Sequence, residues 1–275
     1  MDIIEFLKAV LFGIVEGVTE WLPISSTGHM IILDELIKLD VPAEFLSMFL
    51  VVIQLGAILA VVLLYWERLF PFSLKEKPFV KIDIFQMWLK IVVSCLPAAV
   101  VGILFEEQLD AWFYNYQTVA VMLILFGVAF LWIENRNGGK PAGVNSVGEI
   151  TWQTAFWIGM FQLIAAVFPG TSRSGATILG GIMLGLSRTV AAEYTFFLAV
   201  PVMFGASLLK IVKFGFAFSV PELMILLVGM TVAFVTSLVV IRFLMGYIRR
   251  HDFKVFGWYR IVLGIVVLAF FILFS

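Results

Sequence analysis

Charged residues are scarce in this chain. Asp, Glu, Lys and Arg make up 13% of the 275 residues, while hydrophobic residues make up 62% and the mean hydropathy is +1.08. Soluble domains carry about 25% charged residues, so this composition excludes a soluble globular domain. It indicates an integral membrane protein.

Three further absences narrow the function. The chain has a single cysteine, Cys95, so no intrachain disulfide is expected. A formal net charge of −1 gives no basic excess, so we expect no nucleic-acid partner. The first residues, MDIIEFLK, place Asp2 and Glu5 where a secretory signal carries basic residues, and no small-residue cleavage site follows. We therefore expect no cleaved signal.

Six apolar stretches are long enough to cross a bilayer, which takes about 20 residues of helix. They lie at residues 45–66, 86–106, 117–134, 190–212, 221–246 and 254–274. The connections between them hold most of the charge. The sequence therefore predicts six transmembrane helices.

Residues 3–38 and 150–186 follow a different pattern. Each begins with an apolar helical run that is stopped by Pro23 or Pro169, continues through a polar turn and ends in a second, short apolar run. Proline removes a backbone donor and disfavours helix at the residue before it. Each stretch is either a kinked full span or a re-entrant hairpin that returns to its own side. The short second runs favour hairpins.

An internal repeat relates these two stretches. GIVEGVTEWLPISSTGHMIIL (residues 13–33) and GMFQLIAAVFPGTSRSGATIL (residues 159–179) align without a gap, with proline on proline and Ser26 on Ser172. If each half holds one hairpin and three spans, the odd number of spans inverts the second half relative to the first.

The predicted fold is thus an all-α integral membrane protein with one membrane domain in two inverted-topology repeats. Residues 1–135 form the first repeat, with a hairpin at 3–38 and spans at 45–66, 86–106 and 117–134. Residues 146–275 form the second, with a hairpin at 150–186 and spans at 190–212, 221–246 and 254–274.

Two carboxylates precede the first proline. Glu16 and Glu20 are four residues apart and therefore share a helix face. Ionisable groups at membrane depth cost about 2.5–3.5 kcal/mol each on insertion scales, which makes a functional site the default hypothesis. Neighbouring carboxylates repel unless a cation or arginine lies between them, and divalent cations prefer oxygen ligands. We interpret the pair as metal ligands; the alternative is that one is a hydrogen-bonded structural residue.

Hydroxyls and a histidine follow the first proline, in Ser25-Ser26-Thr27-Gly28-His29. A helix N-terminus offers free N–H groups and the positive end of a dipole, which favour phosphate. Ser25 fits an N-cap better than a ligand contact. His29 lies one turn beyond Ser26, near enough to exchange a proton with a hydroxyl, and we interpret it as catalytic rather than structural.

The second polar turn, PGTSRSGAT (residues 169–177), lacks the second carboxylate, because Ala166 stands where the first copy has Glu20. It gains Arg173, whose planar fork suits phosphate oxygens. Two helix N-termini that face each other across one guanidinium would hold a diphosphate. The alternative role of Arg173 is to neutralise a glutamate, which is compatible with the first.

Three polar residues of the spans are harder to assign. Gln54 either lines the site or forms a hydrogen bond between helices. Glu193 and Arg260, each near the end of a span, are candidates for a structural pair.

At these motifs the chain resembles the undecaprenyl-diphosphate phosphatase family of the bacitracin-resistance type. Residues 16–29, EGVTEWLPISSTGH, match the family's glutamate-rich signature, and residues 169–177 match its second signature, PGxSRSxxT. The likeness covers the whole chain, including IQLG at 53–56 and the late Tyr259-Arg260.

The resemblance implies hydrolysis of a C55 isoprenyl diphosphate to its monophosphate, which recycles the lipid carrier of cell-wall synthesis, with Mg²⁺ or Ca²⁺ as cofactor. It implies catalytic roles for Glu16, Glu20, Ser26, His29 and Arg173, with Glu16 and Glu20 as metal ligands. The expected substrate-binding residues are Ser25, Thr27, Gln54, Gly170, Thr171, Ser172, Ser174 and Thr177.

Two mechanisms stay open. In the first, Ser26 is the nucleophile and His29 or Glu20 takes its proton; in the second, a metal-activated water attacks and Ser26 only binds phosphate. Inverted repeats also suit a lipid-phosphate or ion transporter, and a protein that only binds bacitracin is a further alternative. A membrane acid phosphatase fits poorly, because His251, the second histidine, lies in a charged loop.

Charge in the loops predicts the orientation. With six spans and two hairpins, both termini share one face, whose loops carry four basic residues: Lys8, Lys38, Lys210 and Lys213. The opposite face carries eleven: Arg68, Lys75, Lys77, Lys81, Arg136, Lys140, Arg188, Arg242, Arg249, Arg250 and Lys254. Cytoplasmic loops carry the excess of Lys and Arg, so we expect both termini and the active site on the outer, periplasmic side of a bacterial plasma membrane. The sequence leaves a homodimer open.

Overall fold

The computed structural model describes the chain apart from residues 1–2, 73–78, 139–140, 216 and 275. Within the described part, twelve α-helices and one short 3-10 helix carry the fold, and strand pairing is confined to two isolated bridges. In chain order the helices are α1 (Ile3–Thr19), α2 (Ser26–Leu36), α3 (Ala43–Val52), α4 (Gln54–Leu64), α5 (Trp66–Leu69), α6 (Ile82–Phe113), α7 (Tyr116–Asn137), η1 (Val147–Glu149), α8 (Trp152–Val167), α9 (Arg173–Met183), α10 (Arg188–Phe214), α11 (Val220–Ile248) and α12 (Lys254–Phe274).

The six predicted transmembrane helices are confirmed as helices long and apolar enough to cross a membrane. α3 and α4 together form the first span, since Ile53 between them keeps helical angles of φ −60° and ψ −22°. The second span is the part of α6 up to Phe105, where the helix kinks at φ −128° and ψ 15° before continuing to Phe113. The others are α7, α10, α11 and α12.

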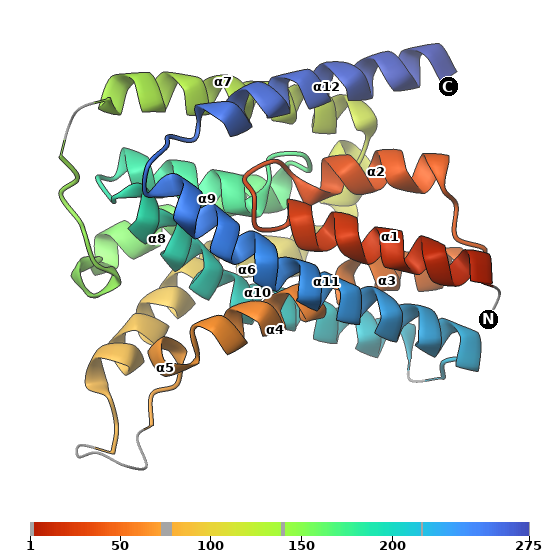
Figure 1. The fold of residues 1–275 in the computed structure, drawn as a ribbon, viewed down its shortest axis with the longest axis horizontal. Coiled ribbons are helices and arrows are strands. Elements are labelled where there is room, and N and C mark those ends of the chain that lie inside the picture. Colours follow the sequence, from red (N-terminus) through yellow and green to blue (C-terminus); the bar gives the residue numbers. More distant parts are fainter. Residues whose placement is uncertain (1–2, 73–78, 139–140, 216, 275) are drawn as a thin grey trace.

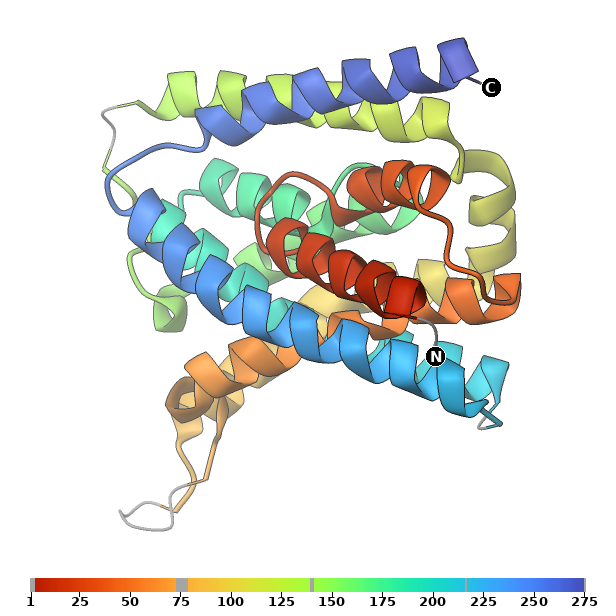
Figure 2. The same cartoon turned by 45° about the vertical axis from the view of Figure 1, so that its right-hand side comes forward.

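Each half of the chain also has two shorter helices. They are separated by a turn that contains Pro23 in the first half and Pro169 in the second. α1 ends at Thr19, and α2 begins at Ser26 and runs back beside α1 (Figures 1 and 2). α8 ends at Val167, and α9 begins at Arg173 and packs against α8. We call residues 20–25 the first turn and residues 168–172 the second turn.

Corresponding helices of the two halves have corresponding partners. α1 packs on α11, and its counterpart α8 packs on α6. A glycine allows each close approach: a Cβ on Gly13 would lie 2.6 Å from the carbonyl oxygen of Gly229, and one on Gly159 would lie 2.5 Å from that of Ser94. Small residues at such crossings let helix backbones meet in membranes. α7 and α12, the last spans of the two halves, lie side by side (Figures 1 and 2).

The two turns lie within the protein and not at its ends. Trp21 of the first turn is fully buried, and its ring meets Phe196 of α10 edge to face at 5.3 Å. Both termini lie at the same end of the molecule (Figures 1 and 2). The packing therefore brings the polar segment of each half to the centre of the molecule.

Candidate active site

Both turns end in a serine with an unusual backbone. Ser25 caps α2 at φ 73°, and Ser172 caps α9 at φ 69°. Each hydroxyl accepts a hydrogen bond from the backbone N–H three residues on, that of Gly28 at 3.3 Å and that of Gly175 at 3.1 Å. A non-glycine residue at positive φ costs of order 1–3 kcal/mol and clusters at functional sites. The interpretation of Ser25 as a helix cap is confirmed.

The shared capping role changes how the two copies of the repeat align. The ungapped alignment set Ser26 on Ser172, but the structure gives Ser25 the capping role of Ser172. Ser26 and Arg173 are therefore equivalent, because each is the first residue of the helix after its turn. The alignment, which sets proline on proline, is wrong by one position here, since one residue separates Pro23 from the cap Ser25 and two separate Pro169 from the cap Ser172.

These two equivalent residues bind the same carboxylate. The Ser26 hydroxyl donates to Glu20 Oε2 at 2.7 Å, and Arg173 Nη2 donates to Glu20 Oε1 at 2.8 Å. The Glu20 side chain is 9% exposed and that of Arg173 is 13% exposed. Hydrogen bonds to ionised groups in such an environment are the strong ones. Glu20 is therefore a residue through which hydrogen bonds link the two halves of the protein.

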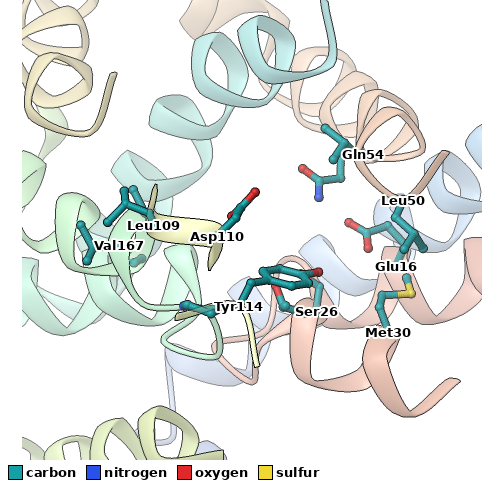
Figure 3. A pocket seen from close by; sticks show the side chains of 14 residues that line it. Glu16, Ser26, Met30, Leu50, Gln54, Leu109, Asp110, Tyr114 and Val167 are labelled. Carbon is teal, nitrogen blue, oxygen red and sulfur yellow. The ribbon is translucent and has the colours of Figure 1, made fainter. Parts of the chain in front are cut away.

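Glu16 lies one turn earlier on α1 and has a different environment. It is 1% exposed, and its Oε1 has no hydrogen-bond partner among the described residues. It lines a cavity of about 270 Å³ (Figure 3). The polar residues lining this cavity are Glu16, Ser26, Thr27, Gln54, Asp110 and Tyr114. A buried carboxylate without a partner is costly, so this oxygen is suited to a cation or a ligand hydroxyl.

Asp110 and Tyr114 were missed by the sequence analysis. They come from the end of α6 beyond its kink at Phe105 and from the residue after it. Figure 3 shows both side chains directed into the cavity, with Asp110 across from Glu16 and Gln54. The available signal was the polar run EEQLD that directly follows the second span.

His29 has partners outside the cavity. Its Nδ1 is 2.8 Å from the carbonyl oxygen of Ser25, and its Nε2 is 2.7 Å from the Tyr259 hydroxyl of α12, on which the ring stacks at 5.6 Å. Both ring nitrogens are thus engaged away from Ser26. Of the two bases proposed for that hydroxyl, Glu20 is the one in hydrogen-bond contact.

The predicted binding residues divide into two groups. Thr27 and Gln54 line the cavity. The others lie in the turns or at the start of α9: the Ser174 hydroxyl donates to the backbone oxygen of Glu20 at 3.0 Å and so joins the turns, whereas the Thr177 hydroxyl donates within α9 to the backbone oxygen of Arg173 at 2.9 Å. The members of this second group are Ser25, Gly170, Thr171, Ser172, Ser174 and Thr177, none of which is among the residues found to line the cavity.

The expected structural pair of Glu193 and Arg260 is wrong. Glu193 forms an ion pair with Arg68 of α5 instead. Arg260 donates to backbone carbonyls of both turns. The sequence could not decide this, because a backbone oxygen leaves no residue-type signal.

The residues near the cavity fit a divalent cation that is also bound by substrate. No group of three or more His, Cys, Asp or Glu side chains in the described ranges could hold a metal ion by itself. Glu20 already engages Ser26 and Arg173, whereas Glu16 keeps an oxygen free beside Gln54. Mg²⁺ is commonly bound by one or two carboxylates together with substrate phosphates. Glu16 is therefore the protein ligand that the geometry favours.

Comparison with known proteins agrees with the family resemblance of the two sequence motifs. The family model described as bacitracin resistance protein BacA matches residues 9–266. A protein of Desulfitobacterium hafniense named undecaprenyl-diphosphatase is 65% identical, with 98% of each chain covered. A Clostridium acetobutylicum protein named undecaprenyl-diphosphatase 1 is 62% identical over 99% of this chain and 100% of its own. An undecaprenyl-diphosphatase of Enterococcus faecalis is 56% identical, with 98% of each chain covered.

Proposed function

Because the chain belongs to the bacitracin resistance protein BacA family, we propose that it hydrolyses undecaprenyl diphosphate to undecaprenyl phosphate and inorganic phosphate at the residues around Glu20. The reaction returns the lipid carrier of cell-wall synthesis to its monophosphate form and confers resistance to bacitracin. The protein is thus a membrane phosphatase.

One observation supports this placement of the chemistry. Ser26 and Arg173 start equivalent helices in opposite halves, and both bind Glu20 beside the cavity that Ser26 and Glu16 line. A nucleophile, a base and a permanent positive charge are the groups that phosphoryl transfer requires.

In the favoured mechanism, Ser26 Oγ attacks the terminal phosphorus while Glu20 accepts its proton. The bond from that phosphorus to the bridging oxygen breaks, which releases undecaprenyl phosphate, and water then hydrolyses the phosphoserine. Protonation of Glu20 also weakens its ion pair with Arg173, so the guanidinium becomes available to the phosphoryl oxygens. In the alternative, water attacks directly and Ser26 binds phosphate.

A divalent cation, Mg²⁺ or Ca²⁺, belongs to the proposal. Glu16, with Gln54 beside it, would hold it together with the diphosphate oxygens, and Glu20 is the second predicted ligand, one turn away. When bound, the cation neutralises charge on the diphosphate. The role of Glu16 in this proposal is to present a carboxylate oxygen at the cavity wall.

Phosphate release from undecaprenyl diphosphate by detergent-purified protein, with and without a chelator, tests both statements. We expect release that the chelator abolishes and added Mg²⁺ or Ca²⁺ restores. Absence of release under all conditions would contradict the hydrolase, whereas chelator-resistant release would contradict only the cation.

The placement in the membrane is a further part of the proposal. α1–α2 and α8–α9 are re-entrant hairpins of two inverted repeats, which the matched pairs α1–α11 and α8–α6 and the common end of both termini support. The excess of basic residues on the opposite face supports a periplasmic position for both termini and for the opening of the first hairpin. A reporter fused after residue 275 tests the orientation, since a cytoplasmic signal would contradict it.

Light scattering in detergent tests for a homodimer.

A further inference from the structure

Arg260 lies on α12, outside both turns, and is fully buried. Its Nη1 donates to the carbonyl oxygen of Pro23 at 3.2 Å, and its Nη2 donates to those of Gly170 at 3.0 Å and Thr171 at 2.6 Å. Its Cζ lies 5.7 Å from the centre of the Phe126 ring. One side chain from a third element therefore binds the backbone of the first and second turns at once.

The carbonyls that it binds need a donor. They follow the ends of α1 and α8, where helical backbone bonding stops and carbonyl oxygens lose their partners. Inside a membrane, neither lipid nor bulk water replaces those partners. Arginine suits the position because its planar fork carries several donors in fixed directions, whereas lysine presents a single nitrogen.

Space for this guanidinium depends on Gly175 of α9. A Cβ at Gly175 would lie 2.6 Å from Arg260 Nη1. Next to it, the Ser174 hydroxyl donates to the backbone oxygen of Glu20 at 3.0 Å and so links the two turns a second time. The start of α9 is thus built around the contact between the turns.

We propose that Arg260 is a positioning residue for phosphoryl transfer. By holding the carbonyls of both turns, it fixes the separation at which Ser26 and Arg173 meet on Glu20. It acts through the backbone and not on substrate, because it is fully buried and its three hydrogen bonds all go to carbonyl oxygens. The inference rests on the hydrolysis proposed above for these residues.

The direct test is Arg260→Lys, which keeps the charge and removes the fork. A displacement of about 1 Å at reacting groups can cost about 10²-fold in rate. We expect kcat for phosphate release from undecaprenyl diphosphate to fall by about that factor and KM to change by much less. Wild-type release is measured first, because its absence would refute the proposed function and leave nothing to attribute to Arg260.

A double-variant comparison separates positioning from a general loss of stability. If Arg260 acts by placing Arg173, then Arg260→Lys should lower kcat by no more than about threefold in an Arg173→Ala background. Equal losses in both backgrounds would overturn the proposal. Arg188→Lys is the matched control: Arg188 binds Glu134 at 2.9 Å and contacts neither turn, so its kcat should stay within a few-fold of wild type. A loss as large as that of Arg260→Lys would also overturn the proposal.

Gly175→Ala provides a second route that leaves Arg260 in place. The added methyl must displace the guanidinium, so this variant should show the same fall in kcat and the same coupling to Arg173→Ala. It decides the question if Arg260→Lys does not fold, as judged by thermal unfolding and gel filtration. Near-normal kcat in either folded variant would refute the positioning role.

Discussion

The first and second turns share a backbone design and differ in the side chains placed on it. Each contains a proline, each ends in a serine at positive φ that caps an eleven-residue helix, and each is followed by a residue that binds Glu20. That residue is Ser26 after the first turn and Arg173 after the second. The two turns thus share one backbone arrangement, and in the proposed mechanism their differing side chains supply the chemistry.

The differing side chains of the two turns explain why the proposed site needs both halves. The first turn and α1 contribute the carboxylates Glu16 and Glu20, which would repel one another without a positive charge nearby. The second turn contributes that charge through Arg173, while the counterpart of Glu16 is the neutral Gln162. Neither half alone supplies the proposed base, the proposed nucleophile and a positively charged side chain to this site.

The largest expected effect comes from removing the hydroxyl after the first turn. If Ser26 is the nucleophile, Ser26→Ala should reduce turnover to near background while substrate still binds. Thr27→Ala, which also removes a hydroxyl from the cavity lining, should lower it only as far as one lost hydrogen bond of about 1–3 kcal/mol allows. Phosphate release and lipid binding are measured on both purified variants.

Substantial hydrolysis by Ser26→Ala, with contaminating phosphatases excluded, would favour the attack of water. The two turns would then be alike in a further respect, since both first residues would only bind and stabilise phosphate.

The next effect comes from the carboxylate that joins the turns and from its partner in the second. Glu20→Gln and Arg173→Ala should each lower turnover by at least about 10²-fold, the scale for lost charge stabilisation. Both proteins should remain folded in detergent, because the six spans do not depend on this ion pair. Near-normal turnover in either would refute the proposed site and reduce the contact between the turns to a structural one.

The sequence predicted the shared frame better than the contacts within it. The six spans and the two proline breaks follow from apolar length and from two prolines, and the structure bears them out. The grouping of Glu20, Ser26 and Arg173 followed from polar residues in apolar surroundings. Other features depend on three-dimensional placement: the kink at Phe105 brings Asp110 to the cavity, and no residue pattern announces that kink.

Two further predictions depended on the same kind of placement: the catalytic role of His29 stays a prediction, and the pairing of Glu193 with Arg260 was wrong. His29 is one helical turn from the Ser26 hydroxyl in sequence, yet Tyr259 of α12 holds its ring on another side of α2. The partners of Arg260 are backbone carbonyls, so charge pairing with Glu193 was a misleading guide. Local patterns locate polar groups, and only the packing of distant helices decides which of them meet.

A third prediction tests whether the frame is the same in both halves. Gly13→Ala and Gly159→Ala should each destabilise the protein by about 1–3 kcal/mol, because each added methyl would lie within 2.6 Å of a facing backbone oxygen. Gly205→Ala on α10 is the control, since a Cβ there would have no heavy atom of another described helix within 4 Å. Thermal unfolding in detergent measures all three. A loss at only one of the two glycines would contradict equivalent packing of α1 and α8.

The smallest effect concerns the serine caps. Ser25→Ala and Ser172→Ala should each cost about 1 kcal/mol, because the cap bond to the following helix is lost while a side chain stays at positive φ. The glycine variants should be close to wild type, because glycine also loses the bond but takes positive φ without strain. Ser219, which caps α11 at φ −68°, provides the control.

At Ser219 there is no such strain to relieve, so exchanging alanine for glycine should recover less stability than at Ser25 or Ser172. Thermal unfolding of the six variants therefore separates the contribution of the cap bond from that of the backbone. A recovery at Ser219 as large as at the other two would mean that positive φ carries no strain here. A recovery at Ser25 but not at Ser172 would mean that positive φ costs free energy in the first turn and not in the second. The two turns would then be alike in backbone geometry and unlike in backbone strain.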